Sequence, residues 1–98
     1  DKKSVKIETP AGNLLSLSED EKAISIKDQN GNKIILNEDG IAIESAKSLT
    51  LKAAQDIKIE GNNVSVDAKM NAAFTGKTEA KVESSAKAVL KGGIVQIN

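Results

Sequence analysis

The sequence predicts an all-β fold: an intertwined triple-stranded β-helix, formed as a trimeric β-prism, with an irregular β-meander as its lead-in. Three observations predict it. Residues 41–98 repeat with a period of eight residues, and such a repeat decides the architecture. Residues 1–40 carry apolar pairs at a longer, less regular spacing, and the whole chain has few large apolar residues for a core of its own. We therefore expect a lead-in over residues 1–40 and a repeat region over residues 41–98.

Four short strands are predicted in the lead-in. Its apolar residues come in pairs that are separated by one residue, and successive pairs lie nine or ten residues apart. Alternate residues of a strand point to the same face, so each pair predicts a strand with one apolar face. The pairs are Val5/Ile7, Leu15/Leu17, Ile24/Ile26 and Ile34/Leu36.

The residues between these pairs have the composition of turns. Pro10 and Gly12 predict a surface turn, which we favour over a hinge at this place. Asn30-Gly31 is a hairpin signal, because both residue types tolerate positive φ. The predicted connections cover residues 9–13, 18–22, 28–32 and 37–40.

Residues 41–98 divide into repeats that we call octads, although two of them are one residue short. Positions one and three of every octad are apolar, position five is small, and position four is mostly charged. The apolar pairs at positions one and three are Ile41/Ile43, Leu49/Leu51, Ile57/Ile59, Val64/Val66, Ala72/Phe74, Ala80/Val82, Ala88/Leu90 and Val95/Ile97.

Each octad is interpreted as one strand followed by one corner. Positions one, three and five point inward and positions two and four point outward, because side chains alternate along a strand. A small residue at position five suits a crowded inner corner, and positions six to eight form the turn. This combination is typical of a β-solenoid or β-prism rather than of a layered domain.

A helix is the competing interpretation of residues 78–91, which are rich in Ala, Glu and Lys. Val82, Ala86, Val89 and Leu90 would form an amphipathic stripe on such a helix. The same residues keep the octad phase of the preceding strands, and a helix gives no reason for that phase. Strands are therefore predicted through this segment as well.

The inward file of apolar side chains indicates that the core is shared between copies. The chain has one Phe, one Met and neither Trp nor Tyr, so a single copy would leave much of this file in water. A single-chain solenoid would have open edges, whereas three copies wound round one axis would pair the edges along the shaft. We therefore expect a homotrimer in which folding and association are one event.

Composition argues against several classes of function. With no His and no Cys, the chain lacks the commonest general base, the thiol nucleophile and His/Cys metal ligands, so we predict neither an enzyme nor a cofactor or metal site. Residues 28–32 resemble the start of a calcium loop but lack its closing Glu, which favours a turn. Fourteen basic and fourteen acidic residues balance, which argues against a nucleic-acid partner.

The beginning of the chain predicts a fragment of a longer protein. It starts Asp1-Lys2-Lys3 without Met, and neither a signal peptide nor a run of transmembrane length is visible.

Three stretches resemble the C-terminal β-helix of VgrG and of phage baseplate spike proteins, and the resemblance covers nearly the whole chain. It is carried by the octads together with residues 28–36 (DQNGNKIIL), residues 39–43 (DGIAI) and the ending at residues 92–98 (GGIVQIN). The resemblance implies an intertwined trimeric needle in a contractile injection machine, such as a phage tail or a type VI secretion system. It also implies upstream baseplate hub domains, assembly in the cytoplasm as part of the apparatus, and ejection toward a target membrane.

The resemblance further implies that a PAAR-repeat protein caps the end of the needle. Spikes that close their own tip hold a metal with histidines, and this chain has none, which favours a separate cap. The alternative function is a passive stalk for binding or adhesion, for which position two offers no ladder of identical residues. The predicted tip-binding residues are Gly92, Gly93, Ile94, Val95, Gln96, Ile97 and Asn98.

Overall fold

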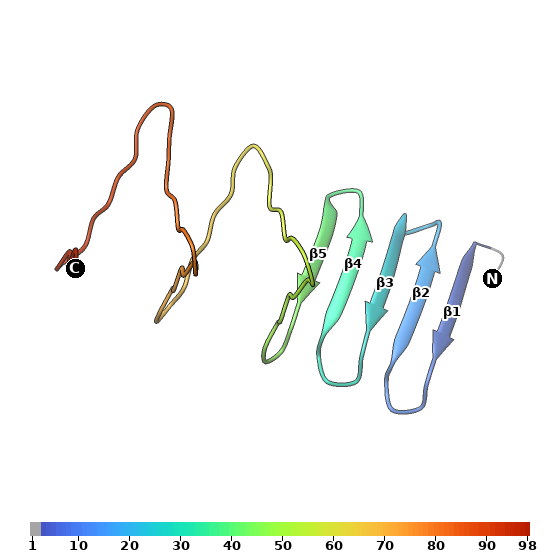
Figure 1. Cartoon of the computed structure of the whole chain (residues 1–98). Helices are drawn as coiled ribbons and strands as arrows, with labels where there is room; N and C mark the ends of the chain where they lie inside the picture. Colours follow the sequence, from blue (N-terminus) through green and yellow to red (C-terminus); the bar gives the residue numbers. More distant parts are fainter. Residues whose placement is uncertain (1–2) are drawn as a thin grey trace. The chain divides into compact units, whose positions relative to one another are not determined.

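The computed structural model describes residues 3–98, so the predicted fragment start at Asp1 and Lys2 lies outside the described residues. Five antiparallel strands form one sheet in the order of the sequence (Figure 1). Residues 3–98 contain no helix, which confirms an all-β chain, and none of them forms a helix that could cross a membrane. The strands are β1 (Ser4–Glu8), β2 (Leu14–Ser18), β3 (Ala23–Lys27), β4 (Lys33–Asn37) and β5 (Gly40–Glu44).

The first four strands lie where the apolar pairs predict them, and β5 is the strand of the first octad. Strand β5 pairs with β4, with Ile43 opposite Ile34 and Ile41 opposite Leu36. The first octad strand is therefore also the last strand of the meander. The division into a lead-in and a shaft at residue 40 stays a prediction.

The strand register gathers the apolar pairs into two rows on one face of the sheet. Residues directly opposite each other in neighbouring strands share a face, so each row crosses all five strands. One row is Val5, Leu17, Ile24, Leu36 and Ile41, and the other is Ile7, Leu15, Ile26, Ile34 and Ile43.

Two asparagine side chains connect the turns at one end of the meander. The Asn13 carboxamide oxygen accepts the backbone N–H of Gln29 at 2.9 Å, which joins the β1–β2 turn to the β3–β4 turn. The Asn32 carboxamide oxygen accepts the backbone N–H of Ala46 at 2.8 Å, which joins the β3–β4 turn to the first corner of the octads. These two hydrogen bonds hold the turns and the first corner together at the point where the chain leaves the sheet after β5.

Asp28 organises the predicted Asn-Gly turn. Its Oδ1 accepts the backbone N–H groups of Asn30 and Asn32 at 2.8 and 3.0 Å. Its Oδ2 accepts the side-chain amides of the same two residues at 3.2 and 2.9 Å. Gly31 has a φ of 96°, which a glycine adopts without strain. The carboxylate is therefore engaged by its own loop, and the turn interpretation is confirmed.

The hydrogen bonds to Asp28 predict a dependence of stability on acid pH. The side-chain amide of Asn32, followed by the backbone N–H groups of Asn32 and Asn30, lowers the pKa of Asp28 from 3.8 to about 2. The unfolded chain binds this proton more tightly, so the stabilisation is complete above about pH 4 and is lost as the pH falls toward about 2. We expect Asp28→Asn to flatten the fall of the unfolding temperature between those pH values. Equal slopes for Asp28→Asn and the wild-type chain would contradict the prediction.

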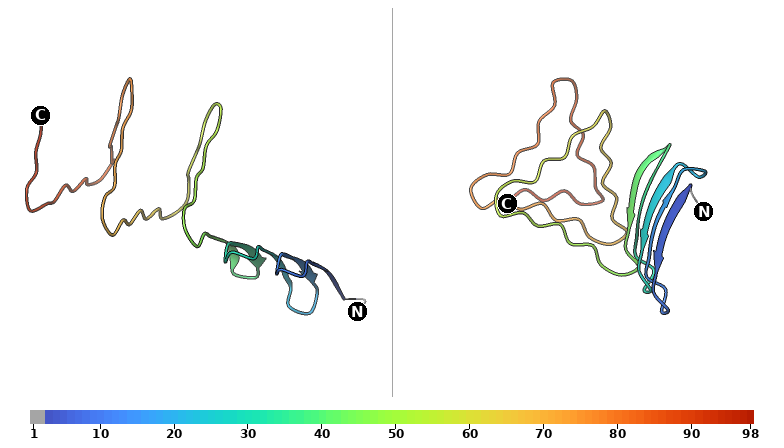
Figure 2. Two further views of the ribbon diagram at one scale, coloured as in Figure 1. Left: turned by 90° about the horizontal axis from the view of Figure 1, so that it is seen from below. Right: turned by 90° about the vertical axis from the view of Figure 1, so that its right-hand side faces the viewer.

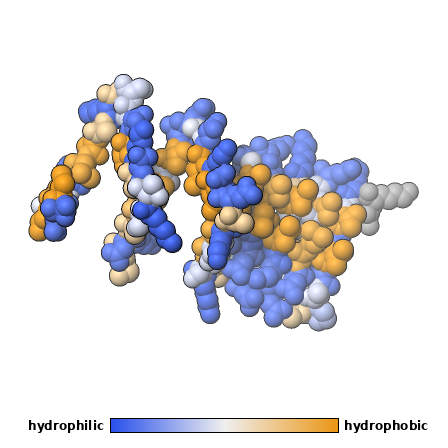
Figure 3. Space-filling view, in the orientation of Figure 1, coloured by the Kyte–Doolittle hydropathy of each residue, from blue (hydrophilic) through white to orange (hydrophobic). Residues whose placement is uncertain are grey.

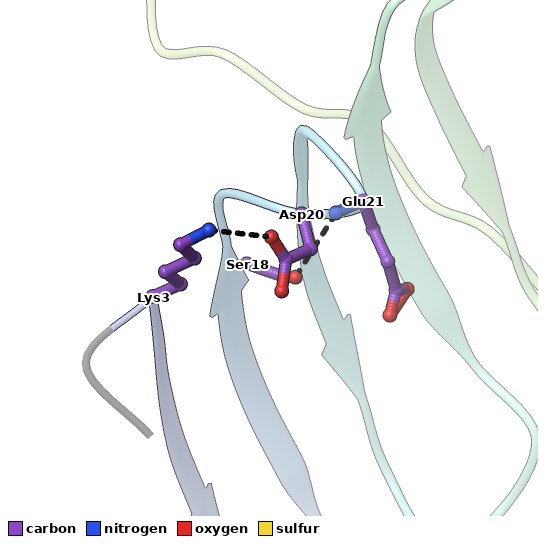
Figure 4. Close-up of polar contacts among 4 residues, drawn as sticks. All are labelled: Lys3, Ser18, Asp20 and Glu21. Atoms are coloured by element: carbon purple, nitrogen blue, oxygen red, sulfur yellow. Dashed lines mark hydrogen bonds and ion pairs between the residues drawn. The ribbon is translucent and has the colours of Figure 1, made fainter.

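Charged side chains close the other end of the meander (Figure 4). The Lys3 Nζ lies 3.8 Å from a carboxylate oxygen of Asp20, and the Ser18 hydroxyl oxygen accepts the backbone N–H of Glu21 at 3.2 Å. Lys22 forms an ion pair of 3.2 Å with Glu38, which joins the β2–β3 turn to the β4–β5 turn. These contacts are exposed to solvent and contribute little to stability individually.

After Glu44 the chain is extended and bends once in every octad. The bends fall at position six throughout, which confirms the predicted corners, and residues 78–91 do not form the alternative helix. The chain forms two compact units, residues 1–57 and 58–98, and the trace of the second unit winds as a triangular coil (Figure 2). The bends lie at residues 46–47, 54–55, 62, 69–70, 77–78, 85–86 and 93–94.

Candidate functional site

The apolar face of the meander is open to solvent. No side chain among residues 3–98 is buried, and apolar side chains gather over this part of the chain in the space-filling view (Figure 3). Ile7 is 61% exposed at one end of its row, and even Ile34, within the sheet, is 36% exposed. Covering one large aliphatic side chain is worth about 1.5–3 kcal/mol. This face therefore has the character of an interface that the single chain does not complete.

Two grooves run along this face. A groove of about 580 Å³ follows the row from Ile7 to Ile43 and continues to Leu49, the first residue of the second octad. A groove of about 680 Å³ follows the row that includes Val5, Leu17 and Leu36. The continuity with Leu49 shows that the meander and the first corner present one apolar surface.

The octads of the second unit expose the same kind of side chain. Val66 and Val82 are 85% and 87% exposed although they occupy inward positions of the repeat. Among the described residues after Glu44, no extended segment pairs with another as a strand. Backbone N–H and C=O groups in extended segments need partners when water is excluded. Both the side chains and the backbone of the octads after the first thus lack their partners among residues 3–98.

The corners are shaped by the small residue at position five. A Cβ added to Gly76 would overlap the carbonyl group of Glu79, and a Cβ on Gly92 would lie 3.1 Å from the carbonyl oxygen of Ile94. At Gly61 the nearest atom to an added Cβ would be the carbonyl oxygen of Asn63, at 3.4 Å. The predicted crowding at the corner is therefore greatest at Gly76.

Serine at position five has a second role, which the sequence reasoning missed. The Ser45 hydroxyl donates to the carbonyl oxygen of Ser48 at 2.7 Å and accepts the backbone N–H of Lys47 at 3.2 Å. The Ser84 hydroxyl oxygen accepts the N–H groups of Ala86 and Lys87 at 3.2 and 3.0 Å. These serine hydroxyls cap backbone groups of the corner. The preference of Ser for turns could have predicted this role.

Positions two and four lie on the same side of an octad strand. Lys81 occupies position two and Glu83 position four of one octad, and their charged groups form an ion pair of 3.2 Å. A contact between residues two apart is the one expected for neighbours on one face of a strand. This pair thus lies on the face opposite to the apolar positions of its octad.

The predicted tip residues end the second unit. The chain bends at residues 93–94, and Ile97 remains 84% exposed while Val95 is 49% exposed. A Cβ added to Gly93 would meet no atom within 4 Å, in contrast to Gly92. The segment thus presents an apolar surface, and its predicted contact with a tip protein stays a prediction.

A comparison with protein families identifies this pattern. The family model described as the phage baseplate V C-terminal trimerisation domain matches residues 4–98. The match covers the meander and the octads together. No curated protein was found to match the chain.

Proposed function

Because this chain belongs to the family of phage baseplate V C-terminal trimerisation domains, we propose that three copies intertwine as the shaft of a cell-puncturing spike. Family membership supports a homotrimer and a structural role in a baseplate. The proposal adds the intertwined winding, the transmission of force to a target membrane and the attachment of a tip protein. Hub domains upstream of this chain would join the shaft to the rest of a contractile injection machine.

The observation that carries the proposal is the set of extended octads after Glu44, which have no strand partner among the described residues. If each octad climbs one strand spacing of about 4.8 Å, two further copies fill the steps between successive coils of the first. Every inner strand edge is then paired, and the apolar file faces the common axis. Eight octads give a shaft on the order of 40 Å in length by this spacing. Bending such a shaft requires many backbone hydrogen bonds to break together, which suits axial force.

The blunt end of the shaft is proposed to hold a PAAR-repeat protein. Three copies of residues 92–98 would bring their exposed Val95 and Ile97 side chains together on one narrow face. An apolar end face with open strand edges is a surface that a partner can cover. Gly92, Gly93, Ile94, Gln96 and Asn98 would form the remainder of this surface.

We expect Ile97→Asp to weaken the binding of a PAAR-repeat protein at least about tenfold, which corresponds to 1.4 kcal/mol. The charge would replace an apolar side chain that points toward the end face. Val89→Asp is the matched control, because Val89 occupies the outward position two of the preceding octad, lies outside residues 92–98 and receives the same charge in place of an aliphatic side chain. Both variants lie in the last two octads, so the rest of the shaft should assemble. Isothermal titration with the trimer measures the two affinities.

Sedimentation equilibrium of the same preparations tests the shaft itself. Trimers of the wild-type chain and of both variants are the expected result, and a folded wild-type monomer would overturn the proposed winding. If trimers form but no PAAR-repeat protein binds, the tip assignment alone is wrong. Equal loss of binding in both variants would also contradict the role of Ile97.

A further inference from the structure

The apolar side chains of the octads do not determine by themselves the register in which the three copies pair. Every octad carries apolar residues at positions one and three, so a copy displaced by one octad would still direct an apolar file inward. Register in a sheet is weakly specified where neighbouring strands offer equivalent patterns. Another set of side chains must therefore distinguish the correct register from the displaced one.

A charged contact of the required kind is present in the meander. Lys33 and Glu44 lie opposite each other in β4 and β5, and their side chains form an ion pair of 3.4 Å. Glu44 occupies position four of the first octad, on the face opposite to the apolar rows. The other edge of β5 has no partner strand among the described residues. The next strand on this edge must come from another copy.

The inference rests on the proposed winding of three copies. Each octad passes to the next side of the prism and climbs one step, so each side carries consecutive octads that belong to different copies. Position four of one octad then lies about 4.8 Å from position four of the next. The position-four residues in order are Glu44, Lys52, Glu60, Asp67, Thr75, Glu83, Lys91 and Asn98.

We infer that these residues form a charge ladder between copies, which sets the register of the trimer. The observed pair of Lys33 and Glu44 continues to Lys52 of a second copy and to Glu60 of a third, with alternating sign. Glu83 and Lys91 make a further pair near the tip. Opposite charges directly across a strand pair are favourable, and like charges are unfavourable. A displacement by one octad would place Glu44 opposite Glu60, so the ladder disfavours that register.

The ladder is interrupted in the middle of the shaft. Glu60 and Asp67 carry the same charge, and Thr75 stands as a neutral step between Asp67 and Glu83. Thr75 is therefore the position at which one added charge tests the inference. A lysine would face a carboxylate on both sides, whereas a glutamate would complete a run of four negative charges from Glu60 to Glu83.

Disulfide trapping tests the register directly, because the chain has no Cys of its own. The double variant Glu44→Cys/Lys52→Cys places one thiol on each of two adjacent steps. Its Cα atoms would lie within the range of 4.4–6.8 Å that a disulfide spans, so oxidation should yield covalent trimers on a denaturing gel. The control Glu44→Cys/Glu60→Cys separates the thiols by two steps and should not form covalent trimers. Covalent trimers from the control alone would show the displaced register and overturn the inference.

Charge variants at Thr75 test whether the ladder contributes energy. We expect Thr75→Lys to raise the unfolding temperature of the trimer by a few degrees and Thr75→Glu to lower it. The difference should shrink at about 1 M salt, where charges are screened over about 3 Å. Equal unfolding temperatures at low salt would overturn the ladder even if the chain sediments as a trimer. A wild-type chain that sediments as a monomer would instead overturn the proposed function.

Discussion

Replacing Leu51 with aspartate is expected to leave the chain monomeric at concentrations at which the wild-type chain is a trimer. Leu51 is 70% exposed in the single chain and occupies an inward position of the second octad. In the wound trimer three carboxylates would meet near the axis without partners. An uncompensated buried charge costs about 3–5 kcal/mol, and the cost recurs in every copy. Sedimentation equilibrium measures the loss of the trimer.

Thr50→Asp is the matched control for this variant. Thr50 precedes Leu51 on the same strand but occupies position two, which faces outward. The control introduces the same aspartate at a position whose side chain points outward. It therefore separates the effect of placing the charge inside the shaft from the effects of charge and of strand propensity. The control should remain a trimer with an unfolding temperature close to that of the wild-type chain. A trimer of Leu51→Asp with unchanged stability would show that the apolar file does not form the core.

The second large effect is expected from Gly76→Ala, which adds one methyl group at a corner. The added Cβ would overlap the carbonyl group of Glu79 and lie 3.3 Å from the amide nitrogen of Ala80. These are backbone atoms, so a side-chain rotation cannot relieve the contact. Overpacking of this kind costs about 1–3 kcal/mol. Because the corner occurs in all three copies, we expect the unfolding temperature to fall by about 10 °C or more.

Gly93→Ala provides the comparison, because it makes the same chemical change at the last corner. An added Cβ on Gly93 would meet no atom within 4 Å. Its unfolding temperature should therefore stay within about 2 °C of the wild-type value, as is usual for exposed substitutions. Thermal denaturation followed by circular dichroism compares the two variants. A fall of similar size in both would indicate a general effect of alanine on the corners, not a contact at Gly76.

Local patterns in the sequence predicted most of the secondary structure. The apolar pairs gave the first four strands, Asn30-Gly31 gave the β3–β4 turn, and the octads gave bends at position six. These features depend on side-chain alternation and on the φ that a residue tolerates, both of which are local properties. The helix suggested by Val82, Ala86 and Leu90 did not form, since helix propensity is a weak preference that other interactions override.

Hydrogen bonds between residues far apart in the sequence could not be predicted from these local patterns. The hydrogen bond from the Gln29 backbone to Asn13 joins residues sixteen apart, and the one from Ala46 to Asn32 joins residues fourteen apart. The sequence does not distinguish a turn asparagine that bonds to its own loop from one that bonds to a neighbouring loop. The tip segment poses a similar difficulty, because its predicted partner is a different protein.

The corners described above have a consequence for the length of the shaft. The nearest atoms to a Cβ added at Gly76 belong to Glu79 and Ala80, and the hydroxyl of Ser84 accepts the N–H groups of Ala86 and Lys87. Each of these two corners is thus a module whose contacts stay within its own repeat and the first residue of the next, whereas the first corner also bonds to Asn32 of the meander. Adding or removing one module turns the remainder of the chain by one side of the prism and changes the height by about 4.8 Å. Insertions or deletions of whole octads should therefore change the length of the shaft in steps of one strand spacing while they keep its cross-section.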